Sequence, residues 1–239
     1  MPDPRISKLA KVLVHYSLEI QPGQQMQLRT HPLAEELTLA VYEEAVKAGA
    51  HVFLSTIIPG TEEIFYKYAS DAQLDYVSPI RKLVAETFDA SLFLWTEHNP
   101  RTLSGIDPAR MARTSKAGAP VNKSFFGRAA RGELRWCLTA YPSEALAQEA
   151  DMCLRDYRDF VYAAGMLALD DPVAFWRQEG ISQRGVVDWM KGRDQVVLKG
   201  ANVDLKMSVK GRTFIPCEGY FYLAYCEIFT SGCGHPPAP

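Results

Sequence analysis

Candidate metal ligands gather near the C-terminal end of the sequence. Cys217, Cys226, Cys233 and His235 lie within nineteen residues, and thiolate and imidazole groups of this kind bind zinc. Their spacing is Cys-x8-Cys-x6-Cys-x-His, without the Cys-x2-Cys knuckle that is typical of zinc ribbons. The sequence therefore favours unpaired thiols over a closed zinc site.

Glu227, a possible metal ligand, lies in the same segment and begins the sequence EIFT at 227–230. A single carboxylate does not make a catalytic metal site, because metallohydrolases use three or more protein ligands. From its position alone, Glu227 is a charged residue at the end of a strand.

The remaining histidines, His15, His31, His51 and His98, form no His-Glu-x-x-His helix and no close pair. His98 follows an apolar run at 91–95, at the strand end where α/β proteins bind ligands, and is a candidate for that reason. The sequence contains neither a Gly-x-Gly-x-x-Gly or P-loop nucleotide motif nor a Gly-x-Ser-x-Gly nucleophile elbow.

Strands and helices alternate over residues 1–191. Asp3-Pro4 starts the first helix, and strands are predicted at 25–30, 50–57, 91–95 and 134–139. The 91–95 run, SLFLW, is short and mainly apolar, which predicts a strand covered on both faces. This alternation predicts an α/β fold, a parallel sheet flanked by helices.

The pattern changes near Gly192, where we predict a domain boundary. Residues 203–210 alternate between apolar and polar, as in an antiparallel strand with one wet face. We expect residues 192–230 to be an opening β segment, the first antiparallel strands of an incomplete C-terminal domain. Residues 231–239 read as an irregular tail, because they are rich in proline and glycine and show no periodicity.

Composition excludes some partners. The net charge of −2 gives no argument for nucleic acid, and no apolar run approaches the roughly 20 residues that span a bilayer. We therefore expect no nucleic-acid and no membrane partner. The N-terminus resembles no signal peptide, and the five cysteines are an odd number. Both observations predict a cytoplasmic protein with reduced thiols.

Several segments resemble the thermophilic metallopeptidase group of metal-dependent aminopeptidases, the aminopeptidase T and aminopeptidase S type. The resemblance covers essentially residues 5–230. The segments that carry it are KLAKVLVHYS at 8–17, AVYEEAVKAGA at 40–50, YPSEALAQEA at 141–150, LKGANVDL at 198–205, VKGRTFI at 209–215 and EIFT at 227–230.

The resemblance implies removal of N-terminal amino acids from peptides by a pair of divalent metal ions, such as zinc or cobalt. The ions would acidify a water, polarise the scissile carbonyl and hold the free amine of the substrate. The ligands of such enzymes lie in the C-terminal domain, and the first of them corresponds to Glu227. The other ligands lie beyond the equivalent of residue 239.

We therefore expect the N-terminal part of an aminopeptidase, a truncated form that binds no metal tightly and is inactive alone. The resemblance also implies a peptide substrate for the complete enzyme and a homodimer. Ala224-Tyr225-Cys226 replaces a Pro-Asp-Gly-like turn before Glu227, and bulky residues tolerate a positive φ poorly. The alternative is a non-catalytic α/β binding or dimerisation module.

Overall fold

The computed structural model describes residues 3–223 and 226–230. The described strands are β1 (Gln25–Thr30), β2 (His51–Thr56), β3 (Ala90–Trp95), β4 (Arg135–Ala140), β5 (Gln195–Gly200), β6 (Val203–Ser208), β7 (Phe214–Glu218), β8 (Tyr222–Leu223) and β9 (Cys226–Thr230). The described α-helices are α1 (Pro4–Val12), α2 (Glu35–Lys47), α3 (Thr61–Tyr68), α4 (Asp71–Leu74), α5 (Pro79–Thr87), α6 (Pro108–Ala130), α7 (Glu144–Glu149), α8 (Leu154–Ala164) and α9 (Pro172–Met190). A π-helix, η1 (Leu13–Ser17), continues α1, and a 3-10 turn, η2 (Pro32–Ala34), precedes α2.

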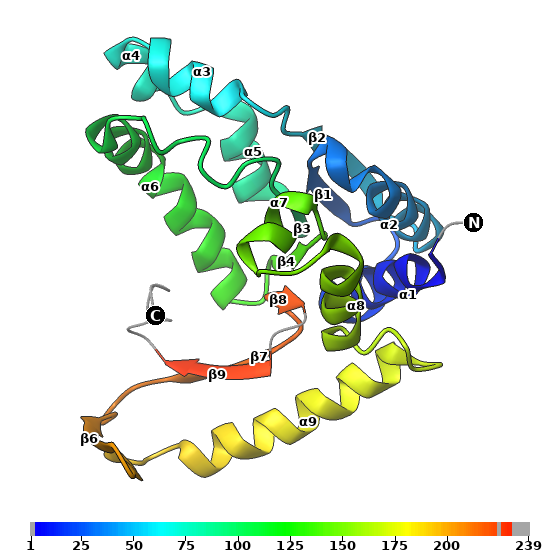
Figure 1. The fold of residues 1–239 in the computed structure, drawn as a ribbon, viewed down its shortest axis with the longest axis vertical. Helices are drawn as coiled ribbons and strands as arrows, with labels where there is room; N and C mark the ends of the chain where they lie inside the picture. The colour runs from blue at the N-terminus through cyan, green and yellow to red at the C-terminus, as the bar shows by residue number, and fades with distance from the viewer. Residues whose placement is uncertain (1–2, 224–225, 231–239) are drawn as a thin grey trace.

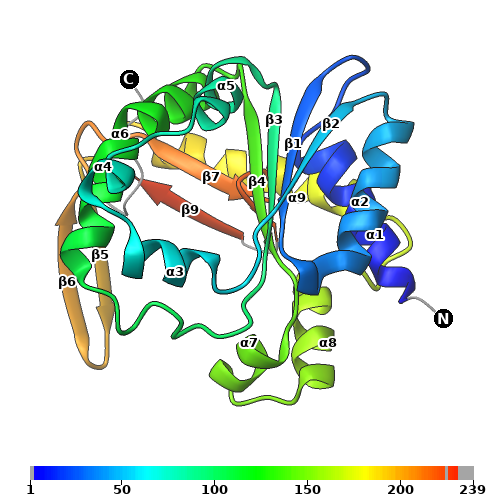
Figure 2. The same cartoon turned by 90° about the horizontal axis from the view of Figure 1, so that it is seen from above.

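A five-stranded parallel sheet lies at the centre of the molecule, in the order β2-β1-β3-β4-β8 (Figure 1). Helices cover both sides of it, with α1 and α2 on one side and α5 and α6 on the other (Figure 2). The predicted α/β fold is confirmed. Two antiparallel pairs, β5–β6 and β7–β9, follow it in the C-terminal part.

The first helix begins where the sequence predicts. The Asp3 carboxylate accepts a hydrogen bond of 3.0 Å from the Arg5 backbone N–H, and Pro4 occupies the first helical turn. Ile6, Leu9 and other apolar residues of the helical stripe are buried against the sheet layer. This stripe anchors α1 and η1 in the core.

The two faces of the sheet differ in how well they are covered. Met26, Leu28 and Leu92 point to the α1–α2 side and are fully buried. Ser91 and Phe93 point to the other side and are only half-buried. The prediction that 91–95 is covered on both faces therefore holds completely for one face only, because α5 and α6 leave part of the second face open.

The segment after α9 has an exposed part and a part that joins the central sheet. The chain turns at Gly192 (φ +75°), and every residue of β6 is exposed, so the prediction of a single wet face is wrong for this strand. Tyr222 and Leu223 of β8 instead return to the sheet and pair with β4. The domain boundary near Gly192 stays a prediction.

None of the described helices is long and apolar enough to cross a membrane.

Candidate functional site

Glu227, the predicted metal ligand, belongs to β9. Its backbone pairs with Cys217 of β7 in the antiparallel register, and its side chain lies outside the described residues. Within the described part of the chain, no group of three or more His, Cys, Asp or Glu side chains is placed to hold a metal ion. The described residues therefore do not fit the metal pair of the resemblance, and Glu227 as a ligand stays a prediction.

The sequence predicts dispersed histidines, and this holds for His15 and His51, whereas His31 and His98 lie near each other. His15 Nε2 lies 2.6 Å from Glu44 Oε1, and His51 is exposed at the start of β2. His31 is nearly buried, and its Nδ1 accepts a hydrogen bond from the Leu33 backbone N–H, so it serves as the cap of η2. Burial lowers the pKa of His31; the Glu97 carboxylate opposes this shift, and the neighbouring His98 adds to it. His31 is therefore a structural residue in its neutral form.

The carboxyl ends of β1 and β3 place His31 near Glu97 and His98. Doubly wound sheets bind ligands at this edge. The Glu97 carboxylate, however, accepts a hydrogen bond from Trp95 Nε1 at 3.1 Å, and Ser143 Oγ donates to the Glu97 carbonyl at 2.7 Å. These hydrogen bonds tie the loop after β3 to the start of α7, and among the described residues this edge carries no group of three side chains placed to hold a metal ion.

The four residues of the zinc alternative are not brought together by any described contact. Cys217 is a fully buried cysteine in β7, while Cys226 is placed by its backbone in β9. Cys233 and His235 lie outside the described residues. Cys217 instead neighbours Cys137 of β4, whose pKa is raised to about 12 chiefly by burial. These two cysteines behave as packed core residues.

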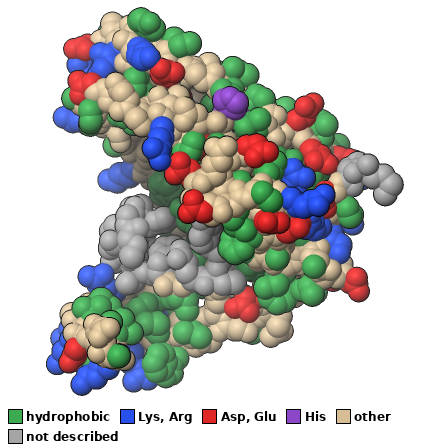
Figure 3. Space-filling view, viewed as in Figure 1, with side chains coloured by type: hydrophobic (Ala, Val, Ile, Leu, Met, Phe, Trp, Pro, Cys, Tyr) green, Lys and Arg blue, Asp and Glu red, His purple; other side chains and the backbone are tan. Residues whose placement is uncertain are grey.

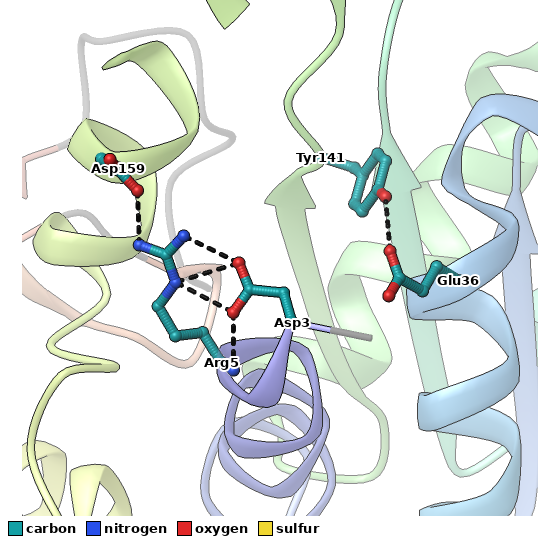
Figure 4. A network of polar contacts seen from close by, with 5 residues as sticks. All are labelled: Asp3, Arg5, Glu36, Tyr141 and Asp159. Carbon is teal, nitrogen blue, oxygen red and sulfur yellow. Dashed lines mark hydrogen bonds and ion pairs between the residues drawn. The ribbon is translucent and has the colours of Figure 1, made fainter. Parts of the chain in front are cut away.

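Two neighbouring sets of polar contacts join distant elements: one links the N-terminus to α8, and the other links the end of β4 to α2 (Figure 4). Arg5 donates to Asp159 Oδ1 at 2.7 Å and to both oxygens of Asp3, which lowers the pKa of the Asp3 carboxyl. The Tyr141 hydroxyl donates to Glu36 Oε2 at 3.5 Å. The carboxylates are already paired with donors, so these contacts connect elements and offer no free general base.

An open groove of about 690 Å³ lies on the second face of the sheet, between the strands, α5 and α6. Arg29, Phe93 and Trp136 reach it from three strands, and Arg81 and Phe125 reach it from the two helices. The sequence analysis did not identify it. The available signal is Arg29 itself, a charged residue near the C-terminal end of an interior strand, where apolar residues prevail.

The comparisons with known proteins agree over most of the chain. A family model described as thermophilic metalloprotease (M29) matches residues 2–224, a range that ends before Glu227. Aminopeptidase 2 of Geobacillus stearothermophilus is 23% identical over 201 residues, which are 79% of this chain and 48% of that protein. Aminopeptidase T of Thermus thermophilus is 23% identical over 215 residues, which are 84% of this chain and 52% of that protein.

The fold comparison gives the same result. Wild-type AmpT from Thermus thermophilus superposes with a TM-score of 0.74 at 19% identity, over 95% of this chain and 61% of that chain. The chain spans about half the length of the curated relatives it matches. Because the family model matches nearly the whole described chain, the protein belongs to the thermophilic metalloprotease family, M29.

Proposed function

We propose that this chain is the N-terminal part of a metal-dependent aminopeptidase that removes N-terminal amino acids from peptides. The observation that supports this most is the family match over residues 2–224, with two aminopeptidases among the relatives. In this proposal the α/β layer is a scaffold, and β7 and β9 begin the part that carries the metal ligands.

We infer further that the 239-residue chain does not hydrolyse peptides by itself. Glu227 is its one proposed ligand, and a two-metal site needs several carboxylate or imidazole groups. The described residues supply no such group of three. No catalytic step is therefore assigned to the residues of this chain.

The direct test is an assay of the purified chain on leucine p-nitroanilide with added Zn²⁺ or Co²⁺. We expect no rate above that of the metal ion alone, and Glu227→Ala should give the same background. Hydrolysis by the natural chain that disappears in Glu227→Ala would overturn the inference of inactivity.

A chimera tests whether this chain can serve as the scaffold of an active aminopeptidase. Residues 1–223 of this chain would replace the matching part of aminopeptidase T of Thermus thermophilus, and we expect a folded enzyme that retains activity. A chimera that folds, binds metal and shows no activity on any aminoacyl p-nitroanilide would argue against the proposed scaffold role.

A homodimerisation module is the second candidate, and one surface favours it. The β5–β6 pairing places Leu198 opposite Leu205 and Val196 opposite Met207, so these side chains share one apolar face. Leu198, Val203, Leu205 and Met207 are between 40% and 49% exposed. Figure 3 shows hydrophobic side chains gathered on this part of the molecule.

Light scattering after size exclusion would test this second candidate. We expect a dimer for the natural chain and a monomer for Leu205→Lys, with Lys206→Leu as a control on the opposite face of the same strand. A monomeric natural chain, or a dimer unaffected by Leu205→Lys, would exclude this face as the dimer interface.

A further inference from the structure

The groove on the second face of the sheet combines an apolar floor with two positive charges. Register places Gln27 beside Phe53 and Ser91, and Arg29 beside Ser55 and Phe93, so these side chains point to the same side. The helices α5 and α6 form the opposite wall. Pockets that bind small molecules share this composition, mainly apolar surface with a few convergent polar groups.

Aromatic rings form much of the groove. Phe126 contacts both Phe125 and Trp136 edge to face, with centroids 5.3 and 5.7 Å apart. Phe53 is 39% exposed in spite of its place on a strand of the sheet. Flat apolar groups pack well against rings arranged in this way, because offset and edge-on contacts are favourable.

Arg29 is the first of the two cations. Its guanidinium carbon lies 4.8 Å from the centroid of the Phe93 ring, which orients the planar group along the floor. No carboxylate among the described residues forms an ion pair with Arg29; Glu62 acts on it only through space. Arg29 is exposed along the groove, yet the surrounding protein atoms desolvate it and lower its pKa, and the charge of Arg81 adds to this effect.

Arg81 is the second cation, and its position is set by α6. Its Nη2 donates to Asn122 Oδ1 at 2.8 Å, a neutral partner that leaves the charge uncompensated. A Cβ at Gly118 would lie 3.1 Å from Arg81 Nη1, so the absence of a side chain at Gly118 makes room for the guanidinium. The two arginines therefore make a positive site beside an aromatic wall.

We propose that this groove binds a carboxylate attached to an aromatic group, in the form of an N-acylated aromatic amino acid or the aromatic C-terminal residue of a peptide. An arginine guanidinium donates two parallel hydrogen bonds to a carboxylate, and the rings accommodate the side chain. A free amino acid fits less well, because its ammonium would lie close to Arg29 and Arg81. The inference goes beyond the proposed peptidase activity and does not depend on Glu227.

Calorimetric titration of the full chain with N-acetyl-L-phenylalanine tests the proposal. We expect saturable binding, at least about tenfold weaker binding of N-acetyl-L-phenylalanine amide, and a similar loss for N-acetylglycine. Gly-Gly-Phe should bind as N-acetyl-L-phenylalanine does if peptides are the source, whereas free phenylalanine should bind about tenfold more weakly. No heat of binding with N-acetyl-L-phenylalanine at about 10 mM, or equal binding of the acid and its amide, would overturn the proposal.

Matched variants localise the effect. Arg29→Gln and Arg81→Gln should each weaken binding of N-acetyl-L-phenylalanine by about tenfold, while Arg177→Gln, an exposed position on α9, should leave it unchanged. The indole N–H resonance of Trp136 should shift on titration, and that of the buried Trp176 should not. An equal loss in all three variants, or a shift of Trp176 alone, would place the ligand elsewhere. Failure of this binding would leave the family assignment and the chimera test unaffected.

Discussion

Replacing Leu223 by alanine tests whether the segment after residue 192 is part of the α/β core. Leu223 lies in β8, is 3% exposed and packs where Tyr16 and Trp176 meet around Gly219. The change removes three carbon atoms, which corresponds to about 2.4 kcal/mol of lost transfer free energy. The cavity left behind raises the expected loss in the free energy of unfolding to about 3 kcal/mol. The thermal midpoint should fall by about 6–12 °C.

Urea unfolding followed by tryptophan fluorescence measures this loss. Val197→Ala is the matched control, because Val197 lies in the same C-terminal segment but is 47% exposed in β5, on the face opposite Leu205. We expect the control to change the free energy of unfolding by no more than about 0.5 kcal/mol. If Leu223→Ala and Val197→Ala destabilise equally, then β8 is not part of the cooperative core and the reasoning is refuted.

Three further predictions concern single residues. Gly219→Ala should destabilise the protein by about 2 kcal/mol or more in urea unfolding, because Gly219 has φ +84° and an added Cβ would lie 3.1 Å from Tyr16; an unchanged midpoint would contradict this packing. Burial lowers the pKa of His31, so the unfolded chain binds more protons below its ordinary value of about 6.5 and stability should fall as the pH drops through that value. His31→Asn, which keeps a capping acceptor, should reduce the slope of unfolding free energy between about pH 5 and pH 7, and an identical slope would rule out the His31 contribution. In native protein at pH 8, a thiol reagent should label the exposed Cys153 and leave the buried Cys137 unmodified until denaturant is added, because burial raises the pKa of the Cys137 thiol to about 12. Peptide mapping by mass spectrometry measures the labelling. Labelled Cys137 in the native protein would show that β4 opens.

Local signals in the sequence were sufficient to predict most strands of the sheet and the start of the first helix. Short runs of apolar residues and flanking turn residues located β1, β3 and β4 to within one residue, and Asp3-Pro4 located the start of α1. These signals are local, since caps, turns and alternation act over a few neighbouring residues. The family resemblance was also carried by the sequence, and the match over residues 2–224 confirms it.

The sequence could not predict which faces the folded chain leaves open. Residues 203–208 alternate as if one face were covered, but coverage depends on another element lying against them, and none of the described elements buries this strand. The two-residue strand β8 has too little pattern to be recognised, and it exists because Leu138 N–H donates to the Phe221 carbonyl across eighty residues of chain.

The groove that contains Arg29 and Arg81 also depends on contacts between distant segments. In the sequence, Arg29 is an unusual charge within a predicted strand, but nothing links it to Arg81, which is 52 positions away in a different element. Only the parallel register of β1 with β3 and the packing of α5 against α6 bring both cations to one aromatic surface. Sequence determines the chemical groups and the local elements, whereas the electrostatic and apolar character of a site arises from distant segments that meet in the folded chain.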